Sequence, residues 1–456
     1  MQMPRENAKL MLRALLLALL LCFSLACVAR EASEVRVEGL LNAANPTCAY
    51  EINVEHDGEA VVTLAAYGPG TSWDKVGAEA AVLSVHVDDV YKGDVVLFSG
   101  ATSYDYQVLL GPLSKGHHRL EFRYEPRKGV LQAQKVRLED YSLRVYGPDD
   151  PLYEVIRHAP IIYGRKEAYR TDVPLLMYHE RWTKDSHTVI QYTVIFSNED
   201  GGTPPEGLMA RWGRLTDIEW AYRVELDKAG EVAREQYQGR DHKAFEFRGE
   251  KEGRHPLLCI ATRNNLFSDQ GRSPYRFALV PEASLPEGHS REELMDLNPW
   301  TYKVMAQEWS REGMEEKGDP DTAWVSDPRN YVYVEFNAEG TARIAVSVKL
   351  QGDPTWYSSD HGVAKLRARS RGWQRSAIEV PSGKTCQDIE AVRFTAYAEK
   401  KSSLPYSLTL HDVSKVFMLN EDFTPTPSVL EWHDKLFLDT DPDTPDPDRV
   451  TFKVGE

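Results

Sequence analysis

The chain of 456 residues contains five cysteines, and its 70 acidic residues outnumber its 54 basic ones, giving a formal net charge of -16. Cys48, Cys259 and Cys386 lie beyond the first 30 residues and allow at most one bridge, so no disulfide framework is expected. The acidic balance argues against nucleic acid or an anionic membrane surface as a partner. No apolar run has the roughly 20 residues that a membrane-spanning helix needs.

The sequence also lacks the signatures of several common enzyme classes. It contains no glycine-rich phosphate loop, no Gly-x-Ser-x-Gly and no His-Glu-x-x-His. These absences disfavour nucleotide-dependent enzymes, the commonest serine hydrolases and zinc proteases.

The first 30 residues have the pattern of a signal peptide, with basic residues before the apolar run 14–21 and small residues after it. The sequence Ser24-Leu25-Ala26-Cys27 resembles a bacterial lipoprotein cleavage box, and cleavage without lipidation is the alternative. Both routes predict an exported protein of the periplasm, the outer cell envelope or the extracellular space. A membrane is then a partner only through a lipid on Cys27.

The length predicts about three domains at roughly 150 residues each. We expect a mainly β protein of tandem β-sandwich domains, in which two flanking sandwiches enclose a central β-rich domain with long polar loops. The expected order is 31–147 for the first sandwich, 148–288 for the central domain, 289–437 for the second sandwich and 438–456 for an acidic, Pro-rich tail extended in solvent.

Alternating apolar and polar residues predict the strands of these domains. The predicted strands are 81–87, 118–124, 188–197, 217–226, 257–262, 331–336, 342–350, 391–398 and 406–410. A helical passage opens the third domain, where Ser290 and Glu293 form a capping-box pattern. Trp300, Val304 and Trp309 are predicted to dock this passage on a neighbouring element.

The first domain is similar to the jelly-roll modules with which exported proteins bind carbohydrate, chiefly through the strand 116–122. The resemblance implies a ligand-binding role for aromatic side chains such as Trp73 and Tyr104, because a sugar ring presents an apolar face to an aromatic ring. The alternative is that both rings pack inside the sandwich.

The central domain carries two acids on one predicted strand. Alternation along 217–226 places Asp217 and Glu219 on one face, about 6.6 Å apart, close enough to share a metal or a water. The alternative is the solvated face of an amphipathic strand. Arg214, His158 and His255 are further catalytic candidates, and His179 and His242 are other histidines of this domain.

The order of several motifs resembles the Vps62-type domain and, more remotely, the necrosis-inducing toxin-like fold. The motifs are His158–Tyr163, Gln191-Tyr192, Asp217–Trp220, Asp241-His242 and His255–Ala261. In those families a Gly-Asp-Trp-Glu or His-Asp-Trp-Glu strand contributes to an acidic, sometimes metal-binding pocket. The resemblance implies that Asp217 and Glu219 are the pocket acids.

The chain departs from that pattern, because no histidine precedes Asp217 and Arg263-Asn264-Asn265 replaces a Gly-Ser-His step. An oxygen-rich pocket of Asp217, Glu219, Asn264, Asn265 and Asp269 suits calcium or a polar substrate better than zinc. The predicted metal ligands are Asp217, Glu219 and Asp269. The predicted ligand-binding residues of this domain are Tyr163, Asn264 and Asn265.

The sequence leads to three functional hypotheses. The first is recognition of a polysaccharide or another polar extracellular polymer through the central polar pocket. The second is a metal-assisted polysaccharide lyase or hydrolase that uses Asp217 and Glu219. The third is a membrane-active, toxin-like protein, which rests on the family resemblance alone.

Overall fold

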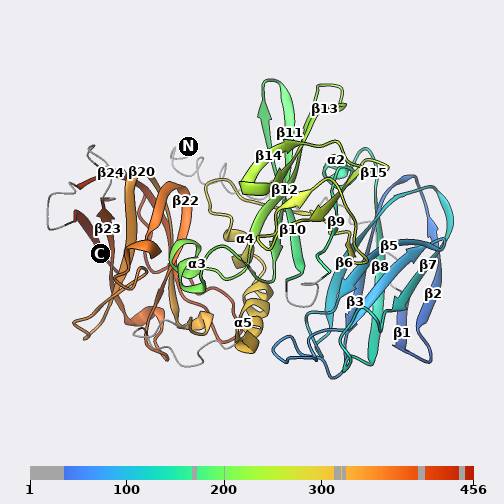
Figure 1. The fold of residues 1–456 in the computed structure, drawn as a ribbon, viewed down its shortest axis with the longest axis horizontal. Helices are drawn as coiled ribbons and strands as arrows, with labels where there is room; N and C mark the ends of the chain where they lie inside the picture. Colours follow the sequence, from blue (N-terminus) through green and yellow to red (C-terminus); the bar gives the residue numbers. More distant parts are fainter. Residues whose placement is uncertain are drawn as a thin grey trace, which may run out of the picture.

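The protein is mainly β, as the sequence predicts, and Figure 1 shows three β-rich parts that follow one another along the long axis. The computed structural model describes residues 35–166, 172–199, 201–312, 320, 325–398, 406–440 and 447–455. The predicted leader and Cys27 lie outside these residues. None of the helices in the described ranges is long and apolar enough to cross a membrane.

The first part is a sandwich of two four-stranded antiparallel sheets, ordered β1-β8-β3-β6 and β2-β7-β4-β5. Its strands are β1 (Val35–Asn42), β2 (Thr47–Val54), β3 (Gly58–Tyr67), β4 (Val82–Val87), β5 (Val90–Val96), β6 (Tyr104–Leu113), β7 (Gly116–Tyr124) and β8 (Lys135–Tyr146). The predicted strands 81–87 and 118–124 correspond to β4 and β7. Leu83 and Phe122 are fully buried between the sheets, because alternate residues of each strand face inward.

The central part has a sheet ordered β14-β13-β12-β11-β10-β19 and a second sheet ordered β15-β16-β9-β18, with β17 paired to β16. Its elements are α2 (Tyr153–Arg157), β9 (Ile161–Tyr163), β10 (Pro174–Lys184), β11 (His187–Phe196), α3 (Pro205–Trp212), β12 (Ile218–Leu226), β13 (Val232–Gly239), η1 (Arg240–His242), β14 (Lys243–Glu246), β15 (Lys251–Glu252), β16 (His255–Ile260), β17 (Phe267–Ser268), β18 (Arg276–Phe277) and β19 (Ala283–Ser284).

The third part begins with two helices and continues as a sheet around one long strand, with the order β25-β24-β20-β23-β26 and β21 and β22 paired to β20. Its elements are α4 (Glu293–Asp296), α5 (Trp300–Glu312), η2 (Pro328–Asn330), β20 (Tyr331–Leu350), β21 (Trp356–Ser358), η3 (Ala364–Leu366), β22 (Ala368–Glu379), η4 (Cys386–Asp388), β23 (Ile389–Tyr397), β24 (Tyr406–Phe417), β25 (Leu436–Thr440) and β26 (Arg449–Lys453).

Two expectations for the third part are wrong in detail. The predicted strands 331–336 and 342–350 form one continuous strand, β20, whose first half pairs with β22 and β24 and whose second half pairs mainly with β23. The tail is not wholly extended in solvent, because β26 pairs with β23 and places Val450 and Phe452 against the hydrophobic core. Alternation of these two apolar residues with polar ones suits a half-buried edge strand. Residues 441–446 lie outside the described residues.

The three parts are joined by shared hydrophobic cores. One core cluster runs from the first sandwich into the central sheets, and another joins the central part to α4, α5 and β20. The predicted docking of the helical passage is confirmed, since the Trp300 ring stacks on Phe98 of the first part at 5.0 Å between centroids and Val304 is buried. The capping box is not formed, because the Ser290 hydroxyl donates to Glu335 instead.

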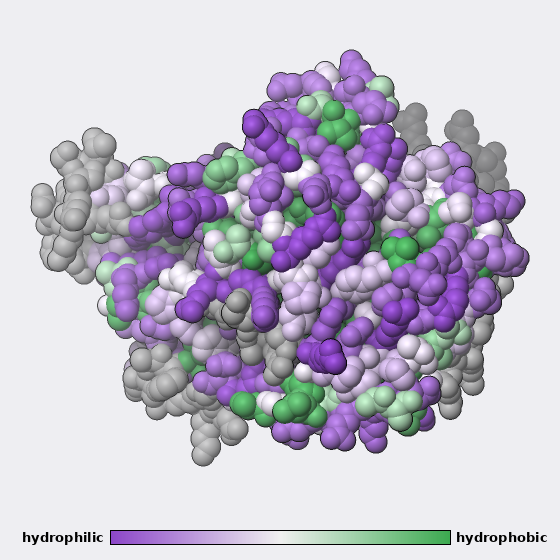
Figure 2. Space-filling model, turned by 45° about the vertical axis from the view of Figure 1, so that its right-hand side comes forward, coloured by the Kyte–Doolittle hydropathy of each residue, from purple (hydrophilic) through white to green (hydrophobic). Residues whose placement is uncertain are grey.

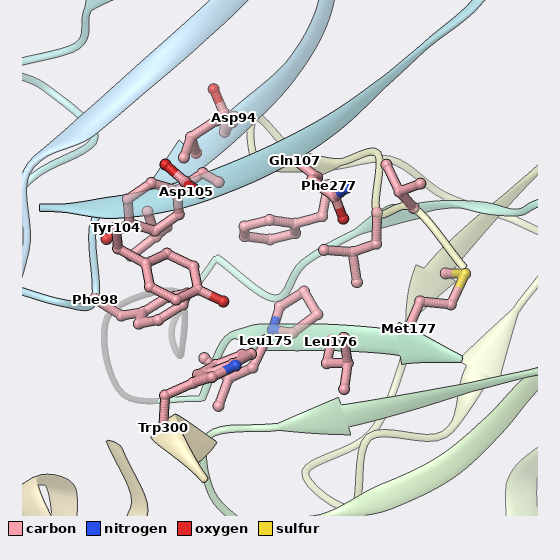
Figure 3. Close-up of a pocket in the computed structure, with 16 residues that line it drawn as sticks. Asp94, Phe98, Tyr104, Asp105, Gln107, Leu175, Leu176, Met177, Phe277 and Trp300 are labelled. Carbon is pink, nitrogen blue, oxygen red and sulfur yellow. The ribbon is translucent and has the colours of Figure 1, made fainter. Parts of the chain in front are cut away.

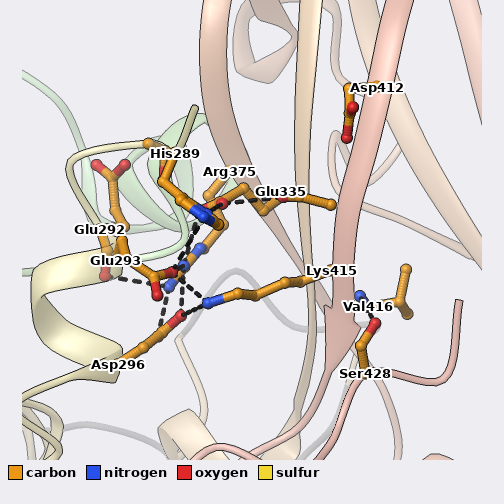
Figure 4. Close-up of polar contacts among 12 residues, drawn as sticks. His289, Glu292, Glu293, Asp296, Glu335, Arg375, Asp412, Lys415, Val416 and Ser428 are labelled. Carbon is orange, nitrogen blue, oxygen red and sulfur yellow. Dashed lines mark hydrogen bonds and ion pairs between the residues drawn. The ribbon is translucent and has the colours of Figure 1, made fainter. Parts of the chain in front are cut away.

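A buried ion-pair network fixes α4 to the sheet of the third part, and Figure 4 shows the side chains of this network converging. Arg375 of β22 is fully buried and lies directly opposite Glu335 of β20 in the antiparallel register. Its guanidinium donates to Glu335 at 2.8 Å and to both carboxylate oxygens of Asp296 in α4, at 2.8 and 2.7 Å. Such bidentate, charge-assisted bonds compensate for the desolvation of the three charges.

Hydrogen bonds from several directions complete this network. The Glu335 carboxylate also accepts from His289, Ser290 and Ser414. Burial by itself would raise the pKa of Glu335. The charge of Arg375 and these hydrogen bonds outweigh burial and hold this pKa well below its usual range. Glu335 is therefore ionised throughout the range in which the protein is handled.

We predict that Arg375→Leu lowers the free energy of unfolding by about 3–5 kcal/mol, because it leaves the Glu335 carboxylate buried without its arginine and Asp296 with Lys415 alone. Urea-induced unfolding followed by tryptophan fluorescence measures the change. The control Arg181→Leu alters an exposed arginine of β10 and is expected to change stability by about 0.5 kcal/mol or less. Equal stability of Arg375→Leu and the control would contradict the prediction.

Candidate functional site

The two predicted pocket acids are buried at the start of β12. Asp217 directly precedes the strand and is 2% exposed, and Glu219 is its second residue and is 7% exposed. The Asn265 amide donates to Asp217 at 3.2 Å and to the buried Asp172 at 3.1 Å. Asn265 has a left-handed backbone (φ 46°), which asparagine tolerates better than most residues. The structure therefore joins Asp217, Glu219 and Asn265 in one polar cluster.

Electrostatics in this cluster favour the protonated acid. Burial raises the pKa of Asp217 well above its ordinary value, and the nearby carboxylates of Glu219 and Glu199 raise it further. Burial also raises the pKa of Glu199. The Asn264 side chain lies between Glu199 and the ring of His242, with Nε2 of His242 at 3.2 Å. A carboxyl group that stays protonated near neutral pH can act as a proton donor, which is one requirement of acid–base chemistry.

His242 connects the buried acids to the surface. Its Nδ1 lies 3.4 Å from the Glu219 carboxylate, and this contact raises the pKa of His242. Asp241 and His242 have consecutive left-handed backbones, with φ of 61° and 56°, in the short turn between β13 and β14. Such strained residues concentrate at functional sites. The sequence placed His242 among several histidines of the domain without distinguishing it.

A pocket of about 660 Å³ opens beside this cluster, between the central part and the third part, and we call it the interdomain pocket. Its volume lies in the range of 300–1,000 Å³ typical of ligand sites. Its lining residues include Thr203, Arg211, Trp212, His242, Arg291, Glu292, Arg343, Lys365, Arg369, Arg371, Trp373 and Gln374. Asp217 and Glu219 are not in the wall. They lie behind His242 and behind Arg291, which donates to the Ile218 carbonyl at 2.6 Å.

Local sequence signals position the α3 wall of the interdomain pocket. Pro205 occupies the first turn of α3, where its fixed φ suits a helix start, and Gly213 ends the helix in the left-handed region (φ 63°). A Cβ on Gly213 would approach the Arg375 side chain to 3.2 Å, so the helix end packs closely on β22. Arg211 and Trp212 are thereby directed to the pocket.

The predicted helper Arg214 lies close to the cluster but is already engaged. Its side chain is 3% exposed, its Nε donates to Glu292 at 2.9 Å, and its Nη1 donates to the Thr216 carbonyl. Arg214 thus fixes the backbone next to Asp217 and neutralises Glu292. It is a supporting residue and has no free face toward a ligand.

The predicted helpers His158 and His255 are not brought to Asp217. The ring of His255 contacts Glu59 of the first part at 3.1 Å and the Ala159 carbonyl at 2.9 Å. His158 is fully buried, and burial lowers its pKa to about 3. His255 thus belongs to the contact between the first and central parts, and His158 lies 3.3 Å from Glu154 of α2, which corrects the assignment of both to the site.

The predicted metal ligands do not converge. Asp269 accepts a hydrogen bond from the Arg248 backbone at 2.8 Å and does not join Asp217 and Glu219. Among the described residues, the histidine and carboxylate groups close enough to share one ion are His289, Glu293 and Glu335. Lys415 and Arg375 already bind these carboxylates, so this group is part of the ion-pair network.

The other predicted ligand-binding residues lie apart from the interdomain pocket. Tyr163 is 6% exposed in β9 and accepts from Arg272 at 3.3 Å. The Trp73 indole is fully buried and donates to Glu308 at 3.0 Å, so it offers no ring face to a sugar. This corrects its predicted stacking role, since the alternative of packing inside the protein is the one observed.

Tyr104 lines a different, much smaller cavity. Figure 3 shows its ring next to Phe98 and Trp300. The cavity, which residues of β6 and β10 line, has a volume of about 80 Å³. This volume is well below that of typical ligand sites. The cavity is a gap in the packing between the first and central parts, and Tyr104 belongs to that contact.

A β-bulge changes which side chains share a face of β12. The pairing with β11 skips Ala221, so Trp220 and Tyr222 do not lie on the same face as strict alternation predicts. Trp220 instead stacks with Arg223 at 4.7 Å, and Arg223 also lies 5.5 Å from the exposed Trp182. We call Trp182, Arg223 and Trp220 the aromatic row of the central sheet. A bulge has no reliable sequence signal, so the sequence did not predict this row.

No family model matches the chain, and no curated protein matches it. Among solved structures, the CBM36-1 domain of a multidomain xylanase from the hindgut metagenome of Trinervitermes trinervoides is 13% identical over 25% of this chain and 93% of that chain (TM-score 0.20). NLPPya in complex with mannosamine is 12% identical over 30% and 75% (0.23). A cycloisomaltooligosaccharide glucanotransferase of Paenibacillus sp. is 11% identical over 55% and 43% (0.18). TM-scores and sequence identities this low do not support a conclusion about function.

We predict that Asp217 contributes a stability that is present at low pH and is lost as pH rises above the ordinary aspartate pKa of about 3.9, and that Asp217→Asn removes this dependence. Because the folded state binds the Asp217 proton more tightly than the unfolded state, it gains stability at low pH and loses it as pH rises through the folded pKa. Melting temperatures of both proteins across this rise in pH measure the effect. The exposed control Asp149→Asn should follow the unmodified protein, and a parallel profile for Asp217→Asn would contradict the prediction.

Proposed function

We propose that the protein recognises an extracellular glycan, or another polar polymer, in the interdomain pocket. The observation that carries the proposal is the composition of this pocket, in which the half-buried rings of Trp212 and Trp373 lie among many hydrogen-bond donors. Aromatic faces suit the apolar side of a sugar ring, and donors suit its hydroxyl and acidic groups. The pocket volume of about 660 Å³ is sufficient for a short oligosaccharide.

The outer surface supports a polar ligand as well. Figure 2 shows a face dominated by hydrophilic residues, on which hydrophobic residues form small, separated patches. A large exposed apolar patch would instead favour a lipid or a protein partner. The proposal therefore agrees with the recognition hypothesis drawn from the sequence and moves its site from the buried acids to the wall in front of them.

A second candidate is a polysaccharide lyase or hydrolase, and the raised pKa of Asp217 beside Glu219 favours it. Both carboxylates are at least nine-tenths buried, so chemistry would have to pass through His242, which lines the pocket and contacts Glu219. Release of reducing ends or unsaturated sugars from a polysaccharide panel, lost in His242→Gln and Asp217→Asn, would establish this candidate. Binding of a polysaccharide without release of a product would support recognition instead.

We predict that Trp373→Ala weakens glycan binding about two- to tenfold, the magnitude of a lost aromatic contact. Isothermal titration of a panel of neutral and acidic oligosaccharides measures the affinity. The matched control is Trp182→Ala, which removes an exposed ring of β10 outside the interdomain pocket. Binding lost in Trp182→Ala and retained in Trp373→Ala would transfer the site to the aromatic row on the central sheet.

A further inference from the structure

The charge of the interdomain pocket is opposite to that of the whole chain. The chain has a formal net charge of -16, whereas its pocket wall contains Arg211, Arg343, Lys365, Arg369 and Arg371. Among the described lining residues Glu292 is the acidic one, and Arg214 already binds its carboxylate at 2.9 Å. Cations gathered in a concave site focus a positive potential there, even on an acidic protein.

Three of these cations have no acidic partner within the described part of the chain. Lys365, Arg369 and Arg371 are exposed, and none of them forms an ion pair there. Glu339 lies opposite Arg371 in the β20–β22 register, but its carboxylate contacts His411 at 3.8 Å. Arg369 and Arg371 are two residues apart on one strand, so their side chains leave the same face about 6.6 Å apart.

Arg211 and Arg343 line the same wall. Arg343 lies directly opposite Arg369 in the antiparallel register, an arrangement that is destabilising for like charges. Burial, together with the charges of Arg343 and Arg369, lowers the pKa of Arg211. In addition, Nε of Arg211 and Nε2 of Gln374 have no acceptor among the described residues. Among the described lining residues, donors and positive charge therefore exceed acceptors and negative charge.

We infer that the interdomain pocket selects an anionic glycan, whose carboxylate or sulfate groups bind to Lys365, Arg369 and Arg371 while a sugar ring lies against Trp373. This inference rests on the proposed function, and it names the ligand class. The guanidinium groups offer two parallel N–H donors to a carboxylate or sulfate. A nucleic acid is the less suitable polyanion, since the acidic surface beyond the pocket repels a long charged duplex.

The test compares oligogalacturonate with the same oligomer after methyl esterification, which removes the charge and leaves the sugar. A sulfated oligosaccharide of equal length tests the other anion, and an oligonucleotide tests nonspecific attraction. Titration calorimetry is performed on the purified protein and on Arg369→Glu with Arg371→Glu. The matched control is Arg181→Glu with Lys228→Glu, which reverses one exposed charge on β10 and one in the turn between β12 and β13.

The expected result is binding of at least one acidic oligosaccharide, weak or no binding of the esterified oligomer, and a fall in affinity of about tenfold or more for each arginine replaced. The control should retain at least half of the affinity. Melting temperatures within a few degrees of the unmodified protein establish that both variants fold, which is expected because all four residues are exposed.

Three other results would overturn the inference in different ways. The free and esterified oligomers could bind equally well, and both could lose binding in Trp373→Ala. This result would support glycan recognition in the pocket and contradict selection for an anionic glycan. Binding of the oligonucleotide as tight as that of the acidic oligosaccharides would show a general polyanion site. No binding of any oligosaccharide would remove both the inference and the proposed function.

Discussion

The buried ion pairs of Arg375 hold the helices of the third part against the sheet of that part. This residue of β22 binds Glu335 of the neighbouring strand and Asp296 of α4 at the same time. The strand β22 leads from the pocket wall into this network. Every second residue of the strand from 369 to 375 is basic or aromatic, namely Arg369, Arg371, Trp373 and Arg375. The network therefore supports the side of the interdomain pocket that the third part forms, where Glu292 binds Arg214 of the central part at 2.9 Å.

Charge is separated in layers around the candidate site. The carboxyls of Asp217 and Glu219 lie inside, and His242 and Arg291 stand between them and the pocket. The cations of β22 and η3 form the outer wall. Burial disfavours the charged form of Asp217 in the inner layer, and the outer cations are left to attract an anion. The two layers have different physical roles, and the sequence patterns predicted only the inner, acidic one.

Sequence patterns succeeded where local rules govern the structure. Period-two alternation located β4, β7 and β23 to within a few residues, and the aromatic spacing of the helical passage predicted the docking of Trp300. Sequence patterns failed where a contact between distant residues determines the local structure. The bulge at Ala221 separates Trp220 from Tyr222, and a pairing partner turns residues 449–453 into β26. Burial of Trp73 depends on Glu308, which lies 235 residues away in the chain.

The sequence by itself determined the β-rich class and the strands, because alternation and turn residues act over a few neighbours. It also identified Asp217, Glu219, Asn264 and Asn265 as members of one polar region. Only the tertiary structure decided that His158 and His255 lie elsewhere, that the acids are covered by His242, and that Arg211 of α3 meets Arg369 of β22 in one pocket. The physical reason is that a site between two parts is formed by packing of distant segments, and a local pattern contains no information on which surfaces will meet.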